Sequence, residues 1–191
     1  MKKKLAIFAS GSGSNTENIC RYFSESPDIS VAIICTNKKD AFVVKRAKKL
    51  QIPTLVVNKT MLNDFNHLKK IFEDAKIDAI VLAGFLLKIP SVVLEKYPKK
   101  IINIHPSLLP KYGGRGMYGD NVHRAVLKNK ESETGITIHL VNENYDEGRV
   151  VLQKKCSVAP NESLKTLSKK VRKLEFKFFP PTIEKILKNK I

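Results

Sequence analysis

The feature that most constrains the fold of this chain is a series of short apolar runs, each followed by a stretch with helical spacing. The runs lie at residues 5–9, 31–35, 54–57, 79–83 and 101–105. The fourth run is uniformly apolar, as is typical of a strand that a parallel sheet buries on both faces. Strand and helix in alternation predict an α/β fold with a doubly wound, mostly parallel twisted sheet.

The C-terminal part of the sequence follows another pattern. Residues 134–141 alternate apolar and polar side chains, which predicts a half-buried strand, and a turn leads to a second strand at residues 150–156. These strands predict an antiparallel hairpin added to the parallel sheet. From about Glu162 the apolar spacing predicts a long C-terminal helix, which Pro180 and Pro181 are expected to break before a short last helix.

The length of the chain suits one domain, and we expect a single domain over residues 1–191. The formal net charge of +17 is unusual, but only six of the 35 basic residues are arginines and the lysines are spread along the chain. Nucleic-acid-binding proteins usually concentrate their charge and rely on arginine. We therefore interpret the lysines as a solvated surface and expect no nucleic-acid partner. A basic nucleic-acid-binding module is the alternative from a different class.

Cysteine usage and the lengths of the apolar runs indicate where the protein works. Cys20, Cys35 and Cys156 are far apart and odd in number, which favours free thiols in a reducing compartment. The N-terminal apolar run is too short for a signal peptide, and the longest run, residues 79–87, covers about half of a membrane span. We expect a cytoplasmic protein without a membrane partner, and no cysteine–histidine cluster predicts a metal.

A glycine-rich turn follows the first predicted strand. Its sequence, Ser-Gly-Ser-Gly-Ser-Asn at residues 10–15, precedes a predicted helix, and Ser14 with Glu17 three residues later predicts a capping box. Strand, glycine turn and helix together direct backbone N–H groups at an anion. Thr16 replaces the third glycine of a dinucleotide fingerprint, and no Gly-Lys-Ser/Thr follows for a nucleoside triphosphate. A phosphate monoester site and a plain structural turn both remain open.

Asn103 and His105 interrupt an apolar strand two residues apart, so a strand places both side chains on one face. Pro106 follows and ends the strand, and ligands of open α/β sheets bind outside the carboxyl ends of strands. A buried histidine paired with an asparagine is the structural alternative. The pairing and the position at a strand end favour a functional role.

Two further loops follow predicted strand ends. The apolar loop at residues 84–88 either packs against a neighbour or lines a pocket for a flat aromatic ligand. Residues 111–119 contain four glycines within seven residues, which predicts a long loop that acts as a mobile lid. Asp120 is expected to cap the helix that follows this loop, and that helix carries His123 and Arg124. In the same way, Asp40 is expected to cap the helix predicted at residues 41–50.

These features together make the sequence resemble the phosphoribosylglycinamide formyltransferases, which are folate-dependent enzymes of purine biosynthesis. The matching pieces are the Ser-Gly-Ser-Gly-Ser-Asn turn, Leu-Ala-Gly-Phe at residues 82–85, Asn-Ile-His-Pro-Ser-Leu-Leu-Pro-Lys-Tyr at 103–112 and Asp-Glu-Gly at 146–148. They occur in the family's order and cover nearly the whole chain. The resemblance implies a Rossmann-like formyltransferase fold, and transfer of the formyl group of 10-formyltetrahydrofolate to the amine of glycinamide ribonucleotide.

The resemblance also implies roles for particular residues. The implied catalytic set is Asn103, His105 and Asp146. Attack of an amine on a formyl carbon builds an oxyanion, which Asn103 and His105 would stabilise, while Asp146 would favour the charged form of His105. The residues implied to hold glycinamide ribonucleotide are Gly13, Ser14, Asn15, Thr16 and Glu17. Those implied to hold 10-formyltetrahydrofolate are Leu86, Leu87, Lys88, Ile89 and Asn103.

Formyl transfer needs no metal, and the expected partners are these two small molecules and, at most, a second copy in a weak homodimer. Two departures from the family limit the transfer of its contacts. The loop at residues 113–122 is longer than in many members, and Lys59 is the only basic candidate near the place of an arginine that some members use for the folate tail.

Related enzymes provide the enzymatic alternatives. Formyl transfer to methionyl-tRNA or to a nucleotide sugar is one, because those relatives share the block at the strand end. The tRNA enzyme carries a further C-terminal domain, and a formyltetrahydrofolate hydrolase carries a further N-terminal domain. We do not expect the tRNA enzyme, since 191 residues leave no room for its extra domain, and we do not expect the hydrolase, since the first predicted strand already begins at Lys4.

Overall fold

The structure is a computed structural model that describes residues 1–190. The chain divides into two compact units, Met1–Ile102 and Asn103–Ile191. The boundary falls inside one strand, β5 (Ile101–His105). The expectation of a single domain over residues 1–191 stays a prediction. Within the described part of the chain, no helix has the length and apolar character that crossing a membrane requires.

The first unit is built on parallel strands in the order β3-β2-β1-β4. These strands are β1 (Lys3–Phe8), β2 (Ile29–Thr36), β3 (Thr54–Val56) and β4 (Ala79–Leu82). Every residue of β4 is buried, as expected for a strand whose two faces are both covered. The uniformly apolar run in the sequence therefore marks the interior of the unit.

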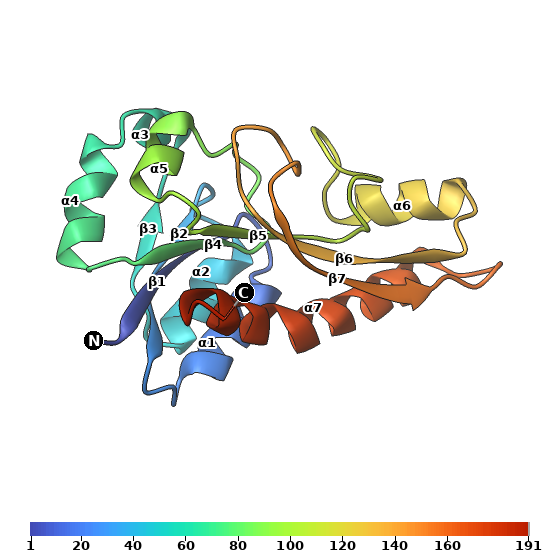
Figure 1. The fold of residues 1–191 in the computed structure, drawn as a ribbon, viewed down its shortest axis with the longest axis horizontal. Helices are drawn as coiled ribbons and strands as arrows, with labels where there is room; N and C mark the ends of the chain where they lie inside the picture. The colour runs from blue at the N-terminus through green and yellow to red at the C-terminus, as the bar shows by residue number, and fades with distance from the viewer. Residues whose placement is uncertain (191) are drawn as a thin grey trace. The chain divides into compact units, whose positions relative to one another are not determined.

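The helices of the first unit lie on both faces of its sheet. Figure 1 shows α3, α4 and α5 on one face and α1 and α2 on the other, which confirms the doubly wound arrangement. Their bounds are α1 (Ser14–Phe23), α2 (Phe42–Lys49), α3 (Lys59–Asn63), α4 (Asn66–Asp74) and α5 (Ser91–Lys96). No pattern in the sequence predicted α3, a short helix that Asn58 caps by accepting a hydrogen bond from the Met61 N–H at 2.8 Å.

An aromatic cluster supports the end of β1. The Phe8 ring lies 6.2 Å from the Phe72 ring and 5.0 Å from the Phe85 ring, measured between centroids, and both contacts are edge-on. Each such contact adds roughly 1 kcal/mol to what burial contributes. Because Phe85 belongs to the loop after β4, the cluster fixes that loop against the carboxyl end of β1.

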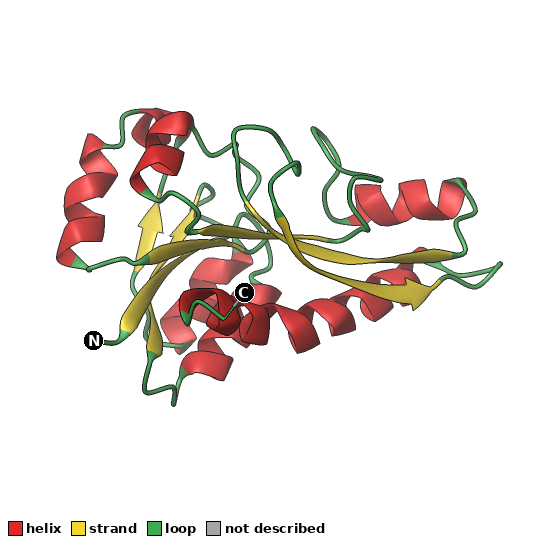
Figure 2. Ribbon diagram, viewed as in Figure 1, coloured by secondary structure: helices red, strands yellow, loops and turns green. Residues whose placement is uncertain are grey.

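The second unit combines an antiparallel hairpin with two helices (Figure 2). The hairpin strands are β6 (Glu133–Leu140) and β7 (Val150–Ser157), and they pair as the alternating pattern predicts. Within the unit the strand order is β5-β6-β7. The helices are α6 (Asp120–Lys128), before the hairpin, and α7 (Leu164–Leu187), which follows it and contacts both hairpin strands and α6.

The predicted break in the C-terminal helix is wrong, because α7 continues through Pro180 and Pro181 as one helix. Each proline removes one backbone N–H donor from the helix. The neighbours Phe179 and Ile183 are fully buried, so the apolar stripe packs on both sides of the prolines. In addition, the Thr182 hydroxyl donates to the carbonyl four residues earlier at 2.7 Å. Burial of the stripe outweighs the lost helical hydrogen bonds.

Two of the predicted helix caps are also wrong. The N-cap of α2 is Ala41 rather than Asp40, and the N-cap of α6 is Gly119 rather than Asp120. Neither helix has a side-chain hydrogen bond at its cap. Asp120 still lies in the first turn of α6, where a carboxylate interacts favourably with the helix dipole.

Candidate active site

The glycine-rich turn lies at a switch in strand order within the first unit. It follows β1, and the strands next to β1 are β2 on one side and β4 on the other. The loop after β4 lies beside the turn. The Ser10 N–H donates to the Gly84 carbonyl at 3.0 Å, and the Leu86 N–H donates to the Ser10 hydroxyl at 2.9 Å. Open α/β sheets bind ligands at such a switch point.

Packing, rather than capping, determines the geometry of this turn. Gly13 is the N-cap of α1 with a φ of 70°, and no side chain caps the helix, so the predicted capping box of Ser14 and Glu17 is wrong. A Cβ atom on Gly13 would lie 2.5 Å from the Val43 side chain and 2.9 Å from its Cα. The tight approach of α2 and the positive φ both require glycine at this position, with or without a ligand.

Glu17 does not present a free carboxylate in this unit. Its two carboxylate oxygens are paired with the guanidinium groups of Arg21 and Arg46. The Nε of Arg46 also donates to the Ser12 carbonyl at 2.8 Å. The Glu17 side chain therefore braces the turn through Arg46, which joins α1, α2 and the turn.

The remaining predicted residues of the turn differ in exposure. Ser14 is half-buried, whereas Asn15 and Thr16 are buried. The Thr16 hydroxyl has no hydrogen-bond partner within residues 1–190. A ligand at this turn would contact the Ser14 side chain and the backbone N–H groups at the start of α1, where helices offer unpaired donors.

The loop after β4 presents apolar surface at two of the four predicted positions. Leu86 is 38% exposed and Leu87 is half-buried, so both can contact a ligand. Lys88 is exposed. Ile89 is 4% exposed and belongs to the core, so only its backbone could face a ligand.

The three predicted catalytic residues come together in the second unit, and His139 joins them. We call Asn103, His105, His139 and Asp146 the histidine cluster. The Asn103 amide nitrogen lies 3.0 Å from His139 Nε2 and 3.5 Å from Asp146 Oδ1. Asp146 Oδ2 lies 3.4 Å from His105 Nδ1, and Asp146 Oδ1 lies 3.6 Å from His139 Nε2. β5, β6 and the turn after β6 each contribute to the cluster.

His139 is a member of the cluster that was not predicted from the sequence. The available signal was its position two residues after Thr137 on an alternating strand, the same spacing that singled out Asn103 and His105. The Thr137 hydroxyl accepts from the Leu109 N–H at 3.0 Å and donates to the Ser107 carbonyl at 2.7 Å, so Thr137 supports the backbone. His139 is 1% exposed, and its Nδ1 faces a backbone carbonyl at 3.3 Å.

Each ring nitrogen of His105 faces an oxygen atom. Its Nε2 lies 2.7 Å from the Tyr112 carbonyl, which can only accept, so the partners place the hydrogen on Nε2. Burial lowers the pKa of His105 below its ordinary value, although Asp146 and the Tyr112 carbonyl both raise it. The expected effect of Asp146 on the charged form is therefore present, but burial outweighs it.

Asp146 occupies a constrained position in the turn after β6. Its φ is 58°, a conformation that residues other than glycine rarely adopt. The Gly114 N–H donates to its Oδ2 at 2.9 Å. Burial raises the pKa of Asp146, but His139, His105 and the Gly114 N–H together lower it below the ordinary value. Asp146 is therefore an ionised acceptor at neutral pH.

The chemistry of the histidine cluster follows from these contacts. The Asp146 carboxylate lies within 3.6 Å of one amide and two imidazoles, an arrangement that suits proton transfer and stabilisation of an oxyanion. The 3.5 Å contact from Asn103 to Asp146 is long for a hydrogen bond. That N–H is the one that can turn toward a substrate oxygen.

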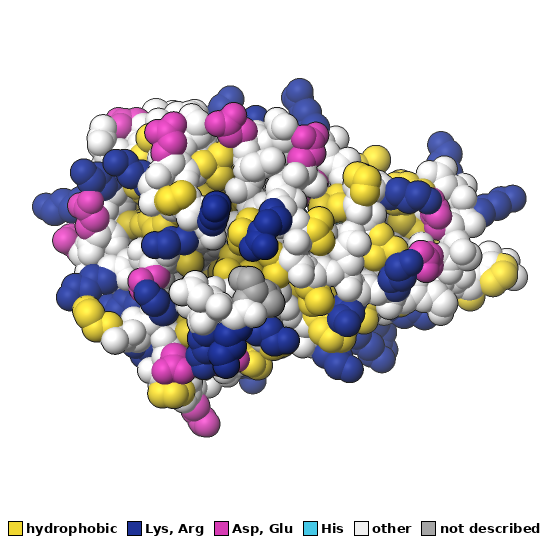
Figure 3. All heavy atoms as spheres, in the orientation of Figure 1, with side chains coloured by type: hydrophobic (Ala, Val, Ile, Leu, Met, Phe, Trp, Pro, Cys, Tyr) yellow, Lys and Arg dark blue, Asp and Glu magenta, His cyan; other side chains and the backbone are white. Residues whose placement is uncertain are grey.

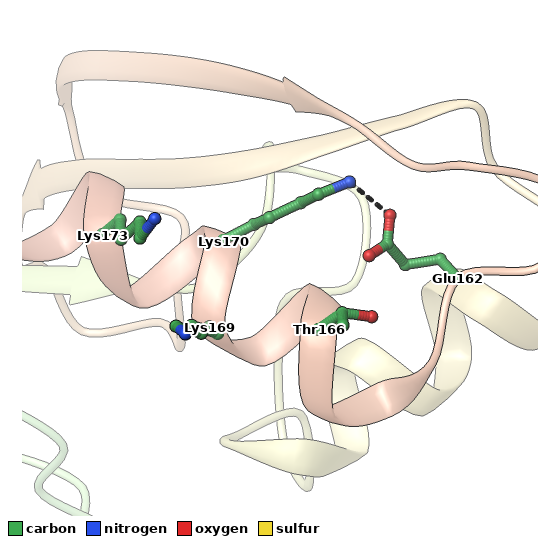
Figure 4. Close-up of a pocket in the computed structure, with 5 residues that line it drawn as sticks. All are labelled: Glu162, Thr166, Lys169, Lys170 and Lys173. Carbon is green, nitrogen blue, oxygen red and sulfur yellow. Dashed lines mark hydrogen bonds and ion pairs between the residues drawn. The ribbon is translucent and has the colours of Figure 1, made fainter.

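A separate hollow on the surface of the second unit contains none of the predicted site residues. It lies along the first turns of α7 and is lined by Glu162, Thr166, Lys169, Lys170 and Lys173 (Figure 4). Lys170 pairs with Glu162 across it. Elsewhere, basic side chains are scattered over the visible face rather than gathered in one patch (Figure 3). No group of three or more potential metal ligands occurs within residues 1–190.

Comparison with known sequences identifies relatives. The sequence model of the formyl transferase family matches residues 3–183. The phosphoribosylglycinamide formyltransferase of Arabidopsis thaliana, a chloroplastic protein, is 38% identical over 100% of this chain and 67% of its own length. The phosphoribosylglycinamide formyltransferase of Bacillus subtilis is 37% identical over 97% of this chain and 95% of its own length.

Solved structures agree with the sequence comparison. Phosphoribosylglycinamide formyltransferase from Anaplasma phagocytophilum superposes with a TM-score of 0.88 at 28% identity, covering 100% of this chain and 90% of the other. The protein of that name from Bacillus halodurans has a TM-score of 0.85 at 32% identity, covering 97% and 95%. The expected Rossmann-like formyltransferase fold is confirmed. This chain belongs to the formyl transferase family, and the relatives named above, which it matches along nearly all of its length, are phosphoribosylglycinamide formyltransferases.

Proposed function

We propose that this enzyme transfers the formyl group of 10-formyltetrahydrofolate to the amine of glycinamide ribonucleotide, a step of purine biosynthesis, with Asn103, His105 and Asp146 as its catalytic residues. The family and the names of its relatives support the reaction. The observation that carries the catalytic assignment is the histidine cluster, which gathers four polar side chains from three segments of one unit, with both histidines buried and Asn103 and Asp146 half-buried. Burying polar groups costs stability unless each finds a partner, and a cluster of this kind is typical of a reactive site.

The reaction starts when the amine nitrogen attacks the formyl carbon. The C=O electron pair moves onto the oxygen, and the Asn103 amide N–H donates to that oxyanion. The attacking nitrogen then gives up a proton, the folate nitrogen takes one, and the C–N bond to the folate breaks as the carbonyl forms again. Atoms and charge balance without a metal or an oxidant.

His105 and Asp146 act on the proton transfers. Neutral His105 can accept a proton and pass it to the leaving folate nitrogen. The imidazolium that forms in between lies 3.4 Å from the Asp146 carboxylate, which stabilises its positive charge. The removal of any one partner disturbs a single transition state, so the effects of the three replacements should not add.

The two loops of the first unit supply the proposed substrate contacts. The start of α1, with Ser14 and the backbone beside Asn15 and Thr16, binds the phosphate of glycinamide ribonucleotide. Gly13 and Glu17 support that turn from behind rather than contact the ligand with side chains. Leu86 and Leu87 contact the pteridine ring of the folate, Lys88 lies at the rim, and the backbone of Ile89 supplies a polar contact.

A turnover assay tests the proposal. Incubation with both substrates should release tetrahydrofolate, and omission of glycinamide ribonucleotide should abolish the reaction. Methionyl-tRNA offered in place of the ribonucleotide should not be formylated. Absence of turnover with glycinamide ribonucleotide, or turnover that survives in His105→Ala, would contradict the assignment. The absence of a nucleic-acid or membrane partner and a weak homodimer at most stay predictions.

A further inference from the structure

The glycine-rich loop contacts both members of the His105–Asp146 pair through its backbone. The Tyr112 carbonyl accepts from His105 Nε2 at 2.7 Å, and the Gly114 N–H donates to Asp146 Oδ2 at 2.9 Å. Two residues of the loop therefore contact the pair, Tyr112 at His105 and Gly114 at Asp146. The position of this short backbone segment determines where the His105 ring can point.

Tyr112 holds this position in a backbone conformation that its side chain disfavours. Its φ is 57°, in the left-handed region that costs a residue other than glycine roughly 1 kcal/mol or more. The sequence offers glycine at the next two positions, where the same conformation would cost less. A tyrosine at this position requires contacts that compensate for the strain.

The Tyr112 side chain makes these contacts away from the histidine cluster. Its hydroxyl donates to Glu131 Oε1 at 2.8 Å and accepts from the Asn129 amide at 2.9 Å. Glu131 also accepts from the Lys111 ammonium at 3.0 Å. The hydrogen bonds from Lys111 and from the Tyr112 hydroxyl lower the pKa of Glu131, so it remains an ionised acceptor near neutral pH.

We propose that Glu131 is a positioning residue for His105: it anchors the Tyr112 hydroxyl, and this anchor keeps the Tyr112 carbonyl on His105 Nε2. The inference rests on the proposed role of His105 in formyl transfer. The consequence is a choice of tautomer. With the hydrogen kept on Nε2, the nitrogen left to gain a proton is Nδ1, which faces the Asp146 carboxylate at 3.4 Å.

Loss of the anchor should change the pKa of His105, which loss of a merely structural contact would not do. The Tyr112 carbonyl raises the pKa of His105 against the effect of burial. When the anchor is lost, the carbonyl can leave Nε2, and the pKa of His105 should fall further. Any limb of the pH–rate profile that belongs to His105 should then move to lower pH.

Four variants distinguish the effect of the hydrogen bond between Tyr112 and Glu131 from a general effect on the loop. Tyr112→Phe removes only the hydroxyl, and Glu131→Ala removes its acceptor. Glu131→Gln keeps a neutral acceptor and should restore most of the function. Glu133→Ala is the matched control, because Glu133 lies two residues further along and pairs with the exposed Lys155, at 2.7 Å.

The titration of His105 in the free protein, followed by NMR of its ring protons, is the decisive measurement. We expect Tyr112→Phe and Glu131→Ala to lower the pKa of His105 and to reduce kcat about tenfold, with KM for both substrates changed less than about twofold. Glu131→Gln should lie close to the wild type, and Glu133→Ala should match it.

An unchanged titration of His105 in folded Tyr112→Phe and Glu131→Ala would overturn the inference. If Tyr112→Phe does not fold, the pair Glu131→Ala and Glu131→Gln decides alone. A different result would show that the proposed function, rather than the anchor, is wrong. In that case His105→Ala would keep its turnover, whereas the titration of His105, which is measured without substrate, would still report whether the anchor acts.

Discussion

The glycine turn of the first unit and the histidine cluster of the second unit both carry polar groups, but different forces hold them. At the turn, Gly13 is required because α2 approaches within 2.5 Å of a Cβ position, and Glu17 is paired with two arginines. The turn is thus explained by packing and surface charge. In the histidine cluster, His105 and His139 are 4% and 1% exposed, and nothing in the packing requires imidazoles there.

Because of this difference, substitutions in the two regions should affect different properties of the protein, stability at the turn and activity at the cluster. A motif whose residues are demanded by packing should lose stability when it is changed, whatever its ligand. A buried polar cluster that packing does not demand should lose activity while the fold survives. The following experiments test that separation.

The largest effect is expected from the histidine cluster. His105→Ala and Asn103→Ala should each lower kcat by about two orders of magnitude or more, because each removes a group that acts on the transition state. Steady-state assays measure the loss, and urea unfolding checks that the fold persists. His67→Ala, at an exposed histidine of α4 that pairs with Asp64, is the control. If kcat fell only twofold in either variant, the catalytic role proposed for that residue would be wrong.

The turn should respond in the opposite way. Gly13→Ala places a methyl group 2.5 Å from Val43 at a φ of 70°, so the free energy of unfolding should fall by about 2 kcal/mol. Gly11→Ala is the matched control, because a Cβ there has no heavy atom within 4 Å. Chemical denaturation of both variants measures the difference. Equal stability of the two would mean that packing does not select Gly13.

Asp146→Asn should have a smaller effect on turnover with a distinct pH signature. The carboxylate raises the pKa of His105, so its removal should lower that pKa and move the matching limb of the pH–rate profile to lower pH. We expect kcat at neutral pH to fall about tenfold. A pH–rate profile that superposes on that of the wild type would reduce Asp146 to a turn residue.

The smallest effect concerns stability against acid. Burial lowers the pKa of His105 from its ordinary 6.5, so the unfolded chain binds the proton more readily. This contribution to stability is present above pH 6.5 and is lost as the pH falls from there through the lower folded pKa. Urea unfolding from pH 7.5 to 5 should show a decline that is shallower in His105→Gln. Identical slopes would assign the decline to other groups.

Local patterns in the sequence account for much of the fold. The uniformly apolar run that became β4, the alternation that became β6 and the strand-end pair Asn103 and His105 each follow from a period of two or from a short buried run. These patterns depend on which face of an element meets the core, so they can be read from neighbouring residues. The predicted roles of Asn103, His105 and Asp146 in catalysis await the experiments above.

The predictions that failed all relied on a local preference of the chain. Asp40, Asp120 and Ser14 have suitable side chains for caps, yet the chain enters those helices through Ala41, Gly119 and Gly13. Pro180 and Pro181 stay within α7 because the helix on both sides of them is buried. At Gly13 and at the two prolines, the packing of distant segments overrides a local preference worth roughly 1 to 3 kcal/mol.

By itself, the sequence determined the alternation of strands and helices and the polar pair at the end of β5. Only the tertiary structure decided that His139 completes the histidine cluster and that the Tyr112 carbonyl holds His105. The physical reason is that strand period places side chains on a face, whereas a hydrogen bond between residues 36 positions apart depends on which strands become neighbours.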